Sequence, residues 1–288
     1  MLAPPLVSHF EQILQAKIAA VRPVAGGDIN RAFQISLADG RQFFLKTNDA
    51  PQAGEMLRAE HLGLVLLGAS QVIAVPKVWA QGVAGTGAFL LMDFVQPGYR
   101  NRLFWENFGT ALANLHGNTS DWFGFSHPNF IGSLPQTNTR HDDWEAFYAN
   151  ERLLPQMILA MDTGKMTADD ARLLENVCRK IGIICPEESP ALTHGDLWSG
   201  NFLCRADGQP VLIDPAASFA HREMDLAMSR LFGGFDAAFY EAYEAAWPLE
   251  PGFERRVELY QLYYLLVHAN LFGGGYVGQV RDVLRRWG

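Results

Sequence analysis

The chain has 288 residues, 49% of them apolar and 19% charged, which is the composition of a folded globular protein. A formal net charge of −8 disfavours nucleic acid as a partner, because no basic field is available to neutralise phosphates. No apolar run approaches the ~20 residues of a membrane span. The three cysteines are scattered, which argues against a disulfide framework or a structural zinc. We therefore expect a monomeric cytoplasmic protein that binds neither nucleic acid nor membranes.

The first third of the chain is predicted to be rich in strands. It opens with an amphipathic helix whose start is indicated by the capping-box pattern Ser8 to Glu11. Two β-rich runs then flank Asp39-Gly40, a favoured pair for a two-residue hairpin turn. The expected elements that follow are a helix at 51–68 and strands at 71–82 and 87–95.

The remainder is predicted to be mostly helical, with long helices within 141–182 and 236–288 and one short β patch at 201–214. The segment Val95 to Asn101, "VQPGYRN", is the expected hinge. The prediction is an α+β, bilobal protein. Its two lobes are a strand-rich small lobe at 1–95 and a helical large lobe at 96–288.

The patch at 201–214 contains a second hairpin, around Asp207-Gly208. A two-residue turn there places Asn201 directly opposite Asp214, just after the loop "HGDLWSG". Asp196, five residues before Asn201, can fold over the same spot. Two carboxylates and an amide oxygen are hard ligands that suit Mg²⁺ together with phosphate oxygens.

The first hairpin gives a matching arrangement in the small lobe. A two-residue turn at Asp39-Gly40 places Lys46 opposite Phe33, near the glycine-rich segment "AGGDIN". Backbone amides around Gly26 and Gly27, beside a fixed ammonium, can hold phosphate. A lysine at the end of an apolar strand needs a partner, and Glu60 on the following helix is the natural one.

Each of these features also has a purely structural interpretation. Lys46 alone could be a solvated strand end, the glycine pair only a turn, and Asp196, Asn201 and Asp214 caps or turn residues. Their order along the chain favours a kinase instead. A glycine-rich turn, a strand lysine, a helix glutamate, the spacing "HGD-x4-N" and a strand-end "LIDP" match the parts needed for phosphoryl transfer.

At these residues the chain resembles the fructosamine kinase (ketosamine kinase) family, within the aminoglycoside-phosphotransferase and protein-kinase-like group. The tryptophan in "HGDLWSGN" is the family's form of the motif, and the likeness extends to "PKVW", "PQTNTRHDDWEAFYANERLLPQ", "HREMDLAM" and "LYQLYYLLVHANLFGGGY". The resemblance implies ATP in a cleft between a small antiparallel lobe and a helical lobe. It also implies Mg²⁺ on the phosphates and a ketosamine acceptor, either free or on a protein lysine.

The resemblance also implies roles for single residues. Asp196 is the base that orients the acceptor hydroxyl, and Asn201 and Asp214 hold Mg²⁺. The residues expected to bind ATP are Lys46 with its partner Glu60, Gly26 and Gly27 over the phosphates, and the adenine hinge Met92, Asp93, Phe94 and Val95. Asp225 is expected to brace the catalytic loop, and His194 to be a structural hydrogen-bonding residue in it.

Three further residues are candidates for contact with the acceptor. Trp198 lies two residues after the base and can stack on a sugar or an amine substituent, or simply pack between the lobes. His221 and Glu223 follow the segment that carries the predicted metal ligand Asp214 and can reach the substrate. Alternatively, "HRE" is a helix cap with surface charges.

Two departures from protein kinases bear on regulation. "IDP" replaces Asp-Phe-Gly and "HGD" replaces His-Arg-Asp, so we do not expect an activation-loop switch. Many eukaryotic relatives carry a redox-active cysteine in the glycine-rich loop, and this loop has none.

The leading hypothesis is therefore an ATP-dependent kinase that phosphorylates the 3-hydroxyl of ketosamines. By resemblance, the unstable product releases the amine, so the role is protein deglycation or repair. The alternatives are a related kinase for an aminoglycoside, choline or another alcohol, and a pseudokinase-like binding module.

Overall fold

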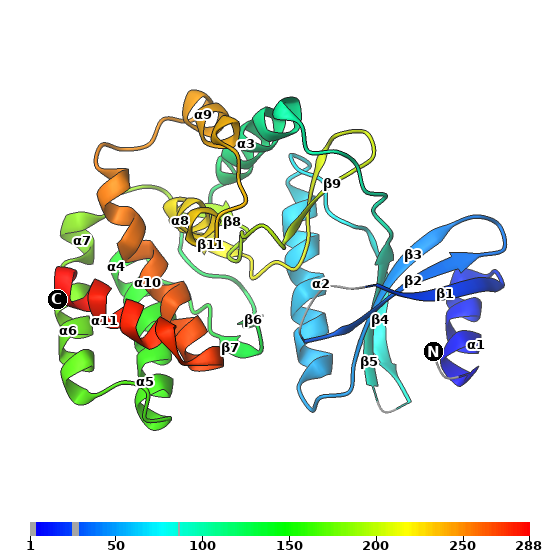
Figure 1. Cartoon of the computed structure of the whole chain (residues 1–288), viewed down its shortest axis with the longest axis horizontal. Coiled ribbons are helices and arrows are strands. Elements are labelled where there is room, and N and C mark those ends of the chain that lie inside the picture. Colours follow the sequence, from blue (N-terminus) through cyan, green and yellow to red (C-terminus); the bar gives the residue numbers. More distant parts are fainter. Residues whose placement is uncertain (1–3, 25–28, 86) are drawn as a thin grey trace.

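The computed structural model describes residues 4–24, 29–85 and 87–288. Figure 1 shows a strand-rich lobe that contains the N-terminal end and a helical lobe that contains the C-terminal end. The strands of the first lobe form one sheet in the order β1-β2-β3-β5-β4, and every neighbouring pair is antiparallel. Its elements are α1 (Pro4–Leu14), β1 (Ile18–Val24), β2 (Arg31–Leu37), β3 (Gln42–Asn48), α2 (Ala53–Ala69), β4 (Val78–Ala84) and β5 (Gly87–Asp93).

The second lobe is mainly helical, as the sequence predicts, but it contains more strands than expected. Besides β9 and β10 in the predicted patch, two further antiparallel pairs occur, β6 with β7 and β8 with β11. Each of these strands has three residues, too few to show a periodic pattern. The elements are α3 (Arg102–His116), β6 (Asn129–Ile131), β7 (Leu134–Gln136), α4 (Trp144–Phe147), η1 (Tyr148–Leu153, a π-helix), α5 (Leu154–Asp162), α6 (Ala168–Cys178), α7 (Ile181–Ile184), β8 (Ala191–Thr193), β9 (Phe202–Cys204), β10 (Pro210–Leu212), β11 (Ser218–Ala220), α8 (Glu223–Leu231), α9 (Ala237–Ala246), α10 (Phe253–Phe272) and α11 (Gly275–Trp287).

Alternation along the central strand β3 explains how the sheet is covered on both faces. Phe43 and Leu45 lie in an apolar cluster with Phe10 of α1. Successive side chains of a strand point to opposite faces, so Phe44 and Lys46 point toward α2. Phe44 packs against the cluster on that side. The lysine is thereby directed to the same side of the sheet as the helix that carries its predicted partner.

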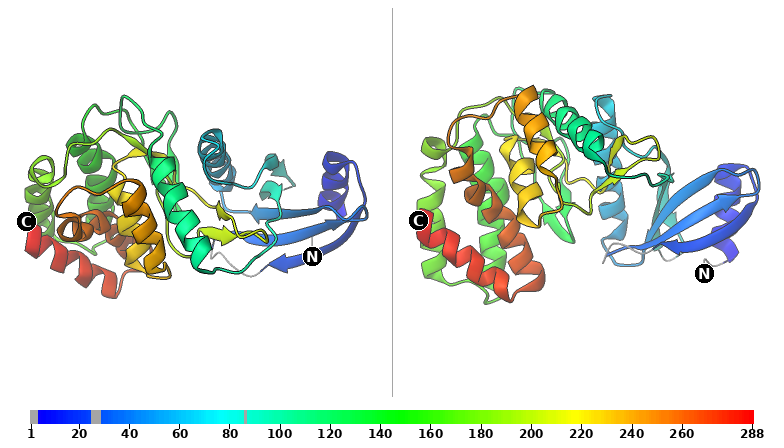
Figure 2. Two further views of the ribbon diagram at one scale, coloured as in Figure 1. Left: turned by 90° about the horizontal axis from the view of Figure 1, so that it is seen from above. Right: turned by 45° about the horizontal axis from the view of Figure 1, so that its top comes forward.

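Helix α2 serves both lobes. Leu57 and Leu64 pack against strand β5 of the sheet. Leu67 has no exposed surface and belongs to the core cluster of the large lobe, together with Ile73 just after the helix. Figures 1 and 2 show α2 standing between the sheet and the helical lobe.

Both hairpin predictions are wrong by one residue, for the same reason. The turns have three residues rather than two, because Gly40 (φ +89°) and Gly208 (φ +81°) adopt the left-handed conformation after a type I-like turn. Lys46 therefore pairs with Ala32 rather than Phe33, and the Ile213 amide donates to the Asn201 carbonyl, so Asn201 faces Ile213 rather than Asp214.

The start of the first helix is also earlier than predicted. Helix α1 begins at Pro4, so Ser8 lies inside it and does not cap it. Proline suits the first helical turn, where its missing N–H has no partner to lose. Within the described residues, no helix is both long and apolar enough to cross a membrane.

Candidate active site

The loop between β8 and β9 is held from beneath by Asp225 of α8. Its two carboxylate oxygens accept the backbone amides of His194 (2.7 Å) and Gly195 (2.8 Å). Gly195 has φ +82°, and a Cβ there would lie 2.2 Å from the Ala216 carbonyl, so only glycine fits. Asp225 has no exposed surface. Burial opposes its ionisation, but the hydrogen bond from His116 and the neighbouring histidines outweigh burial and lower its pKa.

His194 is a buried structural residue of this loop. Its Nε2 lies 2.9 Å from the Ile213 carbonyl, and its Nδ1 accepts the Asp196 amide at 3.2 Å. These contacts fit a neutral ring protonated at Nε2. Burial lowers its pKa, which also favours the neutral form. The His194 side chain thus ties the β8–β9 loop to the segment that carries Asp214.

His116 supports the same loop, and sequence reasoning gave it no such role. It lies at the end of α3, where the pattern "LHG" indicates only a helix end. In the structure it is fully buried, with Nε2 3.2 Å from the Asp225 carboxylate and Nδ1 2.8 Å from the Tyr243 hydroxyl. No short motif relates His116 to Asp225, so only the fold reveals the contact.

Asp196 and Asn201 meet as predicted from their spacing. The Asn201 Nδ2 donates to the Asp196 carbonyl and to its carboxylate, both at 2.9 Å. The same amide lies 3.5 Å from the Asp214 carbonyl, so the three residues share one small volume. Burial raises the pKa of Asp196 to about 7, against the lowering effect of the Asn201 hydrogen bond.

Lys46 joins the two lobes. Its ammonium lies 2.8 Å from the Glu60 carboxylate on α2 and also contacts the Asp214 carboxylate. Burial alone would lower the pKa of Lys46, but the two carboxylates outweigh burial and raise it, so the lysine is charged. Burial raises the pKa of Glu60 to about 7 despite the adjacent ammonium.

The oxygen donors around Asp214 could bind a divalent cation that also contacts phosphates. The Asp214 side chain is 40% exposed, and among the described residues no hydrogen bond reaches the Asn201 Oδ1. These are hard oxygen donors with open sides. Within residues 4–24, 29–85 and 87–288, no group of three or more His, Cys, Asp or Glu side chains could hold a metal alone. Asn201 and Asp214 could therefore supply only part of the ligand set of a divalent cation, with phosphate oxygens as further ligands.

The predicted nucleotide contacts are only partly described. Gly26 and Gly27 lie outside the described residues. Met92 is buried in β5, and the Asp93 amide already donates to the Lys77 carbonyl at 2.9 Å. Phe94 and Val95 follow the strand and are half-buried. Any backbone contact with adenine must therefore use groups other than the Asp93 amide.

The three acceptor candidates have different environments. The Trp198 side chain is 38% exposed, and its ring lies against Gly200, where a Cβ would come within 2.4 Å. His221 and Glu223 are fully buried: His221 faces the Pro186 carbonyl, and Glu223 pairs with Arg256 at 2.5 Å. Neither can contact a substrate in this structure, and "HRE" is not a surface cap either, because its charges pair inside the lobe.

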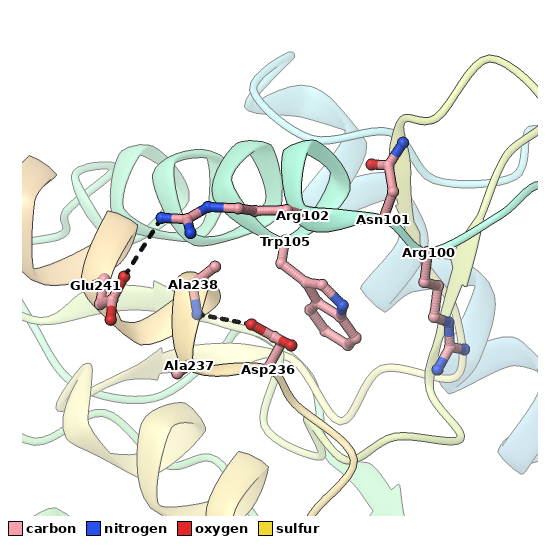
Figure 3. Close-up of a pocket in the computed structure, with 8 residues that line it drawn as sticks. All are labelled: Arg100, Asn101, Arg102, Trp105, Asp236, Ala237, Ala238 and Glu241. Carbon is pink, nitrogen blue, oxygen red and sulfur yellow. Dashed lines mark hydrogen bonds and ion pairs between the residues drawn. The ribbon is translucent and has the colours of Figure 1, made fainter.

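A cavity of about 340 Å³ lies away from these residues, at the first turns of α3 and α9. Figure 3 shows Arg102 and Trp105 facing Asp236 and Glu241 across it. Asp236 caps α9 by accepting the Ala238 amide at 2.9 Å. The cavity is lined by charged groups of both signs, and none of the predicted site residues lines it. We therefore assign this cavity no part in the chemistry.

The antiparallel lobe and the helical lobe together have the fold of protein-kinase-like phosphotransferases. The solved amicoumacin kinase hAmiN, 13% identical, shares this fold over 97% of the present chain and 92% of its own, with a TM-score of 0.59.

The chain belongs to the fructosamine kinase family, whose sequence profile matches residues 6–287. A protein of Enterococcus faecium named "Probable ketoamine kinase" is 40% identical, over 93% of this chain and 95% of its own. The chloroplastic protein-ribulosamine 3-kinase of Arabidopsis thaliana is 37% identical, over 93% and 82%. A solved Thermobifida fusca structure named "putative fructosamine-3-kinase" has 36% identity and a TM-score of 0.89, covering 99% of this chain and 98% of that one.

Proposed function

We propose that this protein is an ATP-dependent kinase that transfers a phosphoryl group to the 3-hydroxyl of ketosamines, either free or attached to protein lysines. The observation that carries the proposal is the meeting of Asp196, Asn201 and Asp214 with Lys46 at the boundary of the lobes. The names of relatives 37–41% identical supply the acceptor class. Because the 3-phosphorylated product is expected to be unstable and to release the amine, the proposed role is deglycation.

In this proposal Asp196 is the residue that acts on the acceptor. It accepts a hydrogen bond from the 3-hydroxyl and aligns the oxygen with the terminal phosphorus of ATP. As the new O–P bond forms and the bond to the ADP oxygen breaks, the hydroxyl proton passes to the carboxylate. Alignment and charge neutralisation do most of the work in such a transfer.

The other residues hold the phosphates. Lys46, fixed by Glu60, places its ammonium against the inner phosphates, and Asn201 and Asp214 supply oxygens to Mg²⁺. The cation, when bound, neutralises the negative charge that develops on the phosphate oxygens. Mg²⁺ is preferred to softer cations because every available protein donor is a hard oxygen.

Exposed aromatic side chains near Asp196 are the proposed binding surface for the acceptor. Ser199, next to Trp198, lies against Gly234, two residues after Phe232, so the segments that carry these two exposed aromatic residues meet. Phe232 is 4.8 Å from His268 between ring centroids, and His268 is 5.6 Å from Phe272. Flat apolar faces suit the C–H surface of a sugar and the alkyl chain of a lysine.

The test is an ADP-release assay with fructosyl-lysine, ribulosyl-lysine and a glycated peptide, beside aminoglycosides and choline. We expect turnover with the ketosamines alone, loss of it in Asp196→Ala, and phosphate on the sugar's third carbon by NMR. Turnover only with an aminoglycoside or choline would show that the acceptor is that compound rather than a ketosamine. Binding of ATP without turnover of any acceptor would contradict the enzyme assignment.

A further inference from the structure

The segment that carries Asp214 is attached to the small lobe as well as to the large one. The Leu212 amide donates to the Ala74 carbonyl at 2.9 Å, and Val211 forms a parallel bridge with Ala74, just after α2. Asp214 itself contacts Lys46. The strand that leads into the metal loop is thus bonded to the small lobe at successive residues.

Gly63 of α2 lies directly against Pro215, the residue after Asp214. A Cβ built at Gly63 would lie 2.9 Å from the Pro215 Cγ and 3.6 Å from the Pro215 carbonyl oxygen. Both residues are buried. The helix can approach the proline ring this closely only because position 63 has no side chain.

The same face of α2 carries the partner of Lys46. Glu60, Gly63 and Leu67 are spaced i, i+3 and i+7, which places them on one side of a helix. Glu60 pairs with Lys46, and Leu67 enters the large-lobe core. One rigid helix therefore fixes the ammonium and the docking position of the loop together.

The backbone at the loop transmits this docking to the carboxylate. Asp214 has φ +54°, a conformation uncommon outside glycine, and the proline ring fixes φ at the next residue. With so little torsional freedom, a shift of Pro215 moves the Asp214 carboxylate as well.

Resting on the proposed function, we propose that Gly63 is a positioning residue. By admitting the Pro215 ring against α2, it holds the Asp214 carboxylate at its working distance from Lys46.

The test compares Gly63→Ala with Gly54→Ala. Both glycines lie in α2, but a Cβ at Gly54 meets nothing within 4 Å. We expect Gly63→Ala to lower kcat/KM for Mg·ATP about 10- to 100-fold, as displaced catalytic groups do. Gly54→Ala should remain near wild type. Calorimetric titration with Mg²⁺ and a non-hydrolysable ATP analogue should show the same order of affinities without any acceptor.

Rescue decides whether the effect runs through the proline. Pro215→Ala removes the atom that the new methyl group would meet, so Gly63→Ala should lower the Mg·ATP affinity far less in a Pro215→Ala background than in wild type. An equal loss in both backgrounds, or wild-type nucleotide affinity in a merely less stable Gly63→Ala, would overturn the proposal. If wild-type protein binds Mg·ATP but turns over no ketosamine, the proposed function fails, while this cycle of variants still tests Gly63.

Discussion

The acidic side chains of the candidate site and those inside the large lobe differ in how many of their carboxylate oxygens have protein hydrogen-bond or ion-pair partners. Asp225 and Glu223 have no exposed surface, and protein groups occupy both oxygens of each. Asp214 stays 40% exposed and contacts one ammonium, and Asp196 accepts a single side-chain amide. Carboxylates whose oxygens are all paired with protein groups stabilise the lobe. Carboxylates with unpaired oxygens remain available to bind ligands or take part in chemistry.

Closeness to a motif in the sequence therefore does not distinguish structural carboxylates from those available for chemistry. Glu223 and Asp225 are two residues apart on α8, and both lie close after the metal loop. One pairs with Arg256 and the other holds the catalytic loop. The following predictions test whether the division holds.

Asp196→Ala should give the largest effect. Removing a general base lowers rates about 10²- to 10⁴-fold, so we expect kcat for ketosamine phosphorylation to fall in that range. ATP affinity should remain, because Lys46 and Asp214 are unchanged. ADP release and ATP titration measure the two quantities. Asp142→Ala, at a side chain 87% exposed on the same lobe, is the control. Unchanged turnover in Asp196→Ala would show that Asp196 is not catalytic and would contradict the division between structural and available acids.

Arg256→Met should instead destabilise the lobe. It leaves the fully buried Glu223 carboxylate without its cation, and breaking a buried pair costs about 3–5 kcal/mol. Thermal and urea unfolding measure the loss. The double variant Glu223→Leu/Arg256→Met should recover much of it, since no charge is left unpaired. If kcat falls at a temperature where the single variant is folded, Glu223 is not merely structural.

Glu188→Gln should give a smaller loss that depends on pH. Burial opposes ionisation of Glu188, but hydrogen bonds from Arg222 (2.8 and 2.9 Å) and the charge of its guanidinium lower the pKa of Glu188 below the ordinary 4.5. The ionised carboxylate therefore stabilises the fold above that pH, and this contribution is lost as the pH falls through the lowered pKa. We expect a deficit of roughly 1.5–3 kcal/mol at pH 7.

Unfolding of wild type and Glu188→Gln between pH 7 and pH 3 checks the sign. The two free energies of unfolding should converge as the pH falls, because protonated Glu188 resembles glutamine. A deficit that is the same at every pH would mean that the carboxylate's charge contributes nothing.

Trp198→Ala should give the smallest effect and sharpens the comparison on the acceptor side. A lost aromatic contact of about 0.5–1.5 kcal/mol corresponds to a 2- to 12-fold rise in KM for the ketosamine, with KM for ATP unchanged. Ile183→Ala, at an exposed apolar residue of α7, is the control. An equal rise in KM for both substrates would assign Trp198 to packing between the lobes.

Sequence reasoning predicted the contacts among the candidate site residues where those residues lie in short local patterns. The spacing from Asp196 to Asn201 is five residues on one loop, and their contact follows from that loop alone. The Lys46–Glu60 pair follows from a strand and the next helix. The hairpin registers were wrong because Asp-Gly also fits a three-residue turn with a left-handed glycine, and the pattern does not distinguish the two.

What the sequence determined by itself is the set of groups and their order: a strand lysine, a helix glutamate and a loop of carboxylates with an amide. The tertiary structure decided which acids stay open. Burial of His221 and Glu223, support of Asp225 by His116, and the approach of Gly63 to Pro215 all join residues far apart in the chain. Such contacts depend on how helices pack, and packing is set by the whole core rather than by any local pattern.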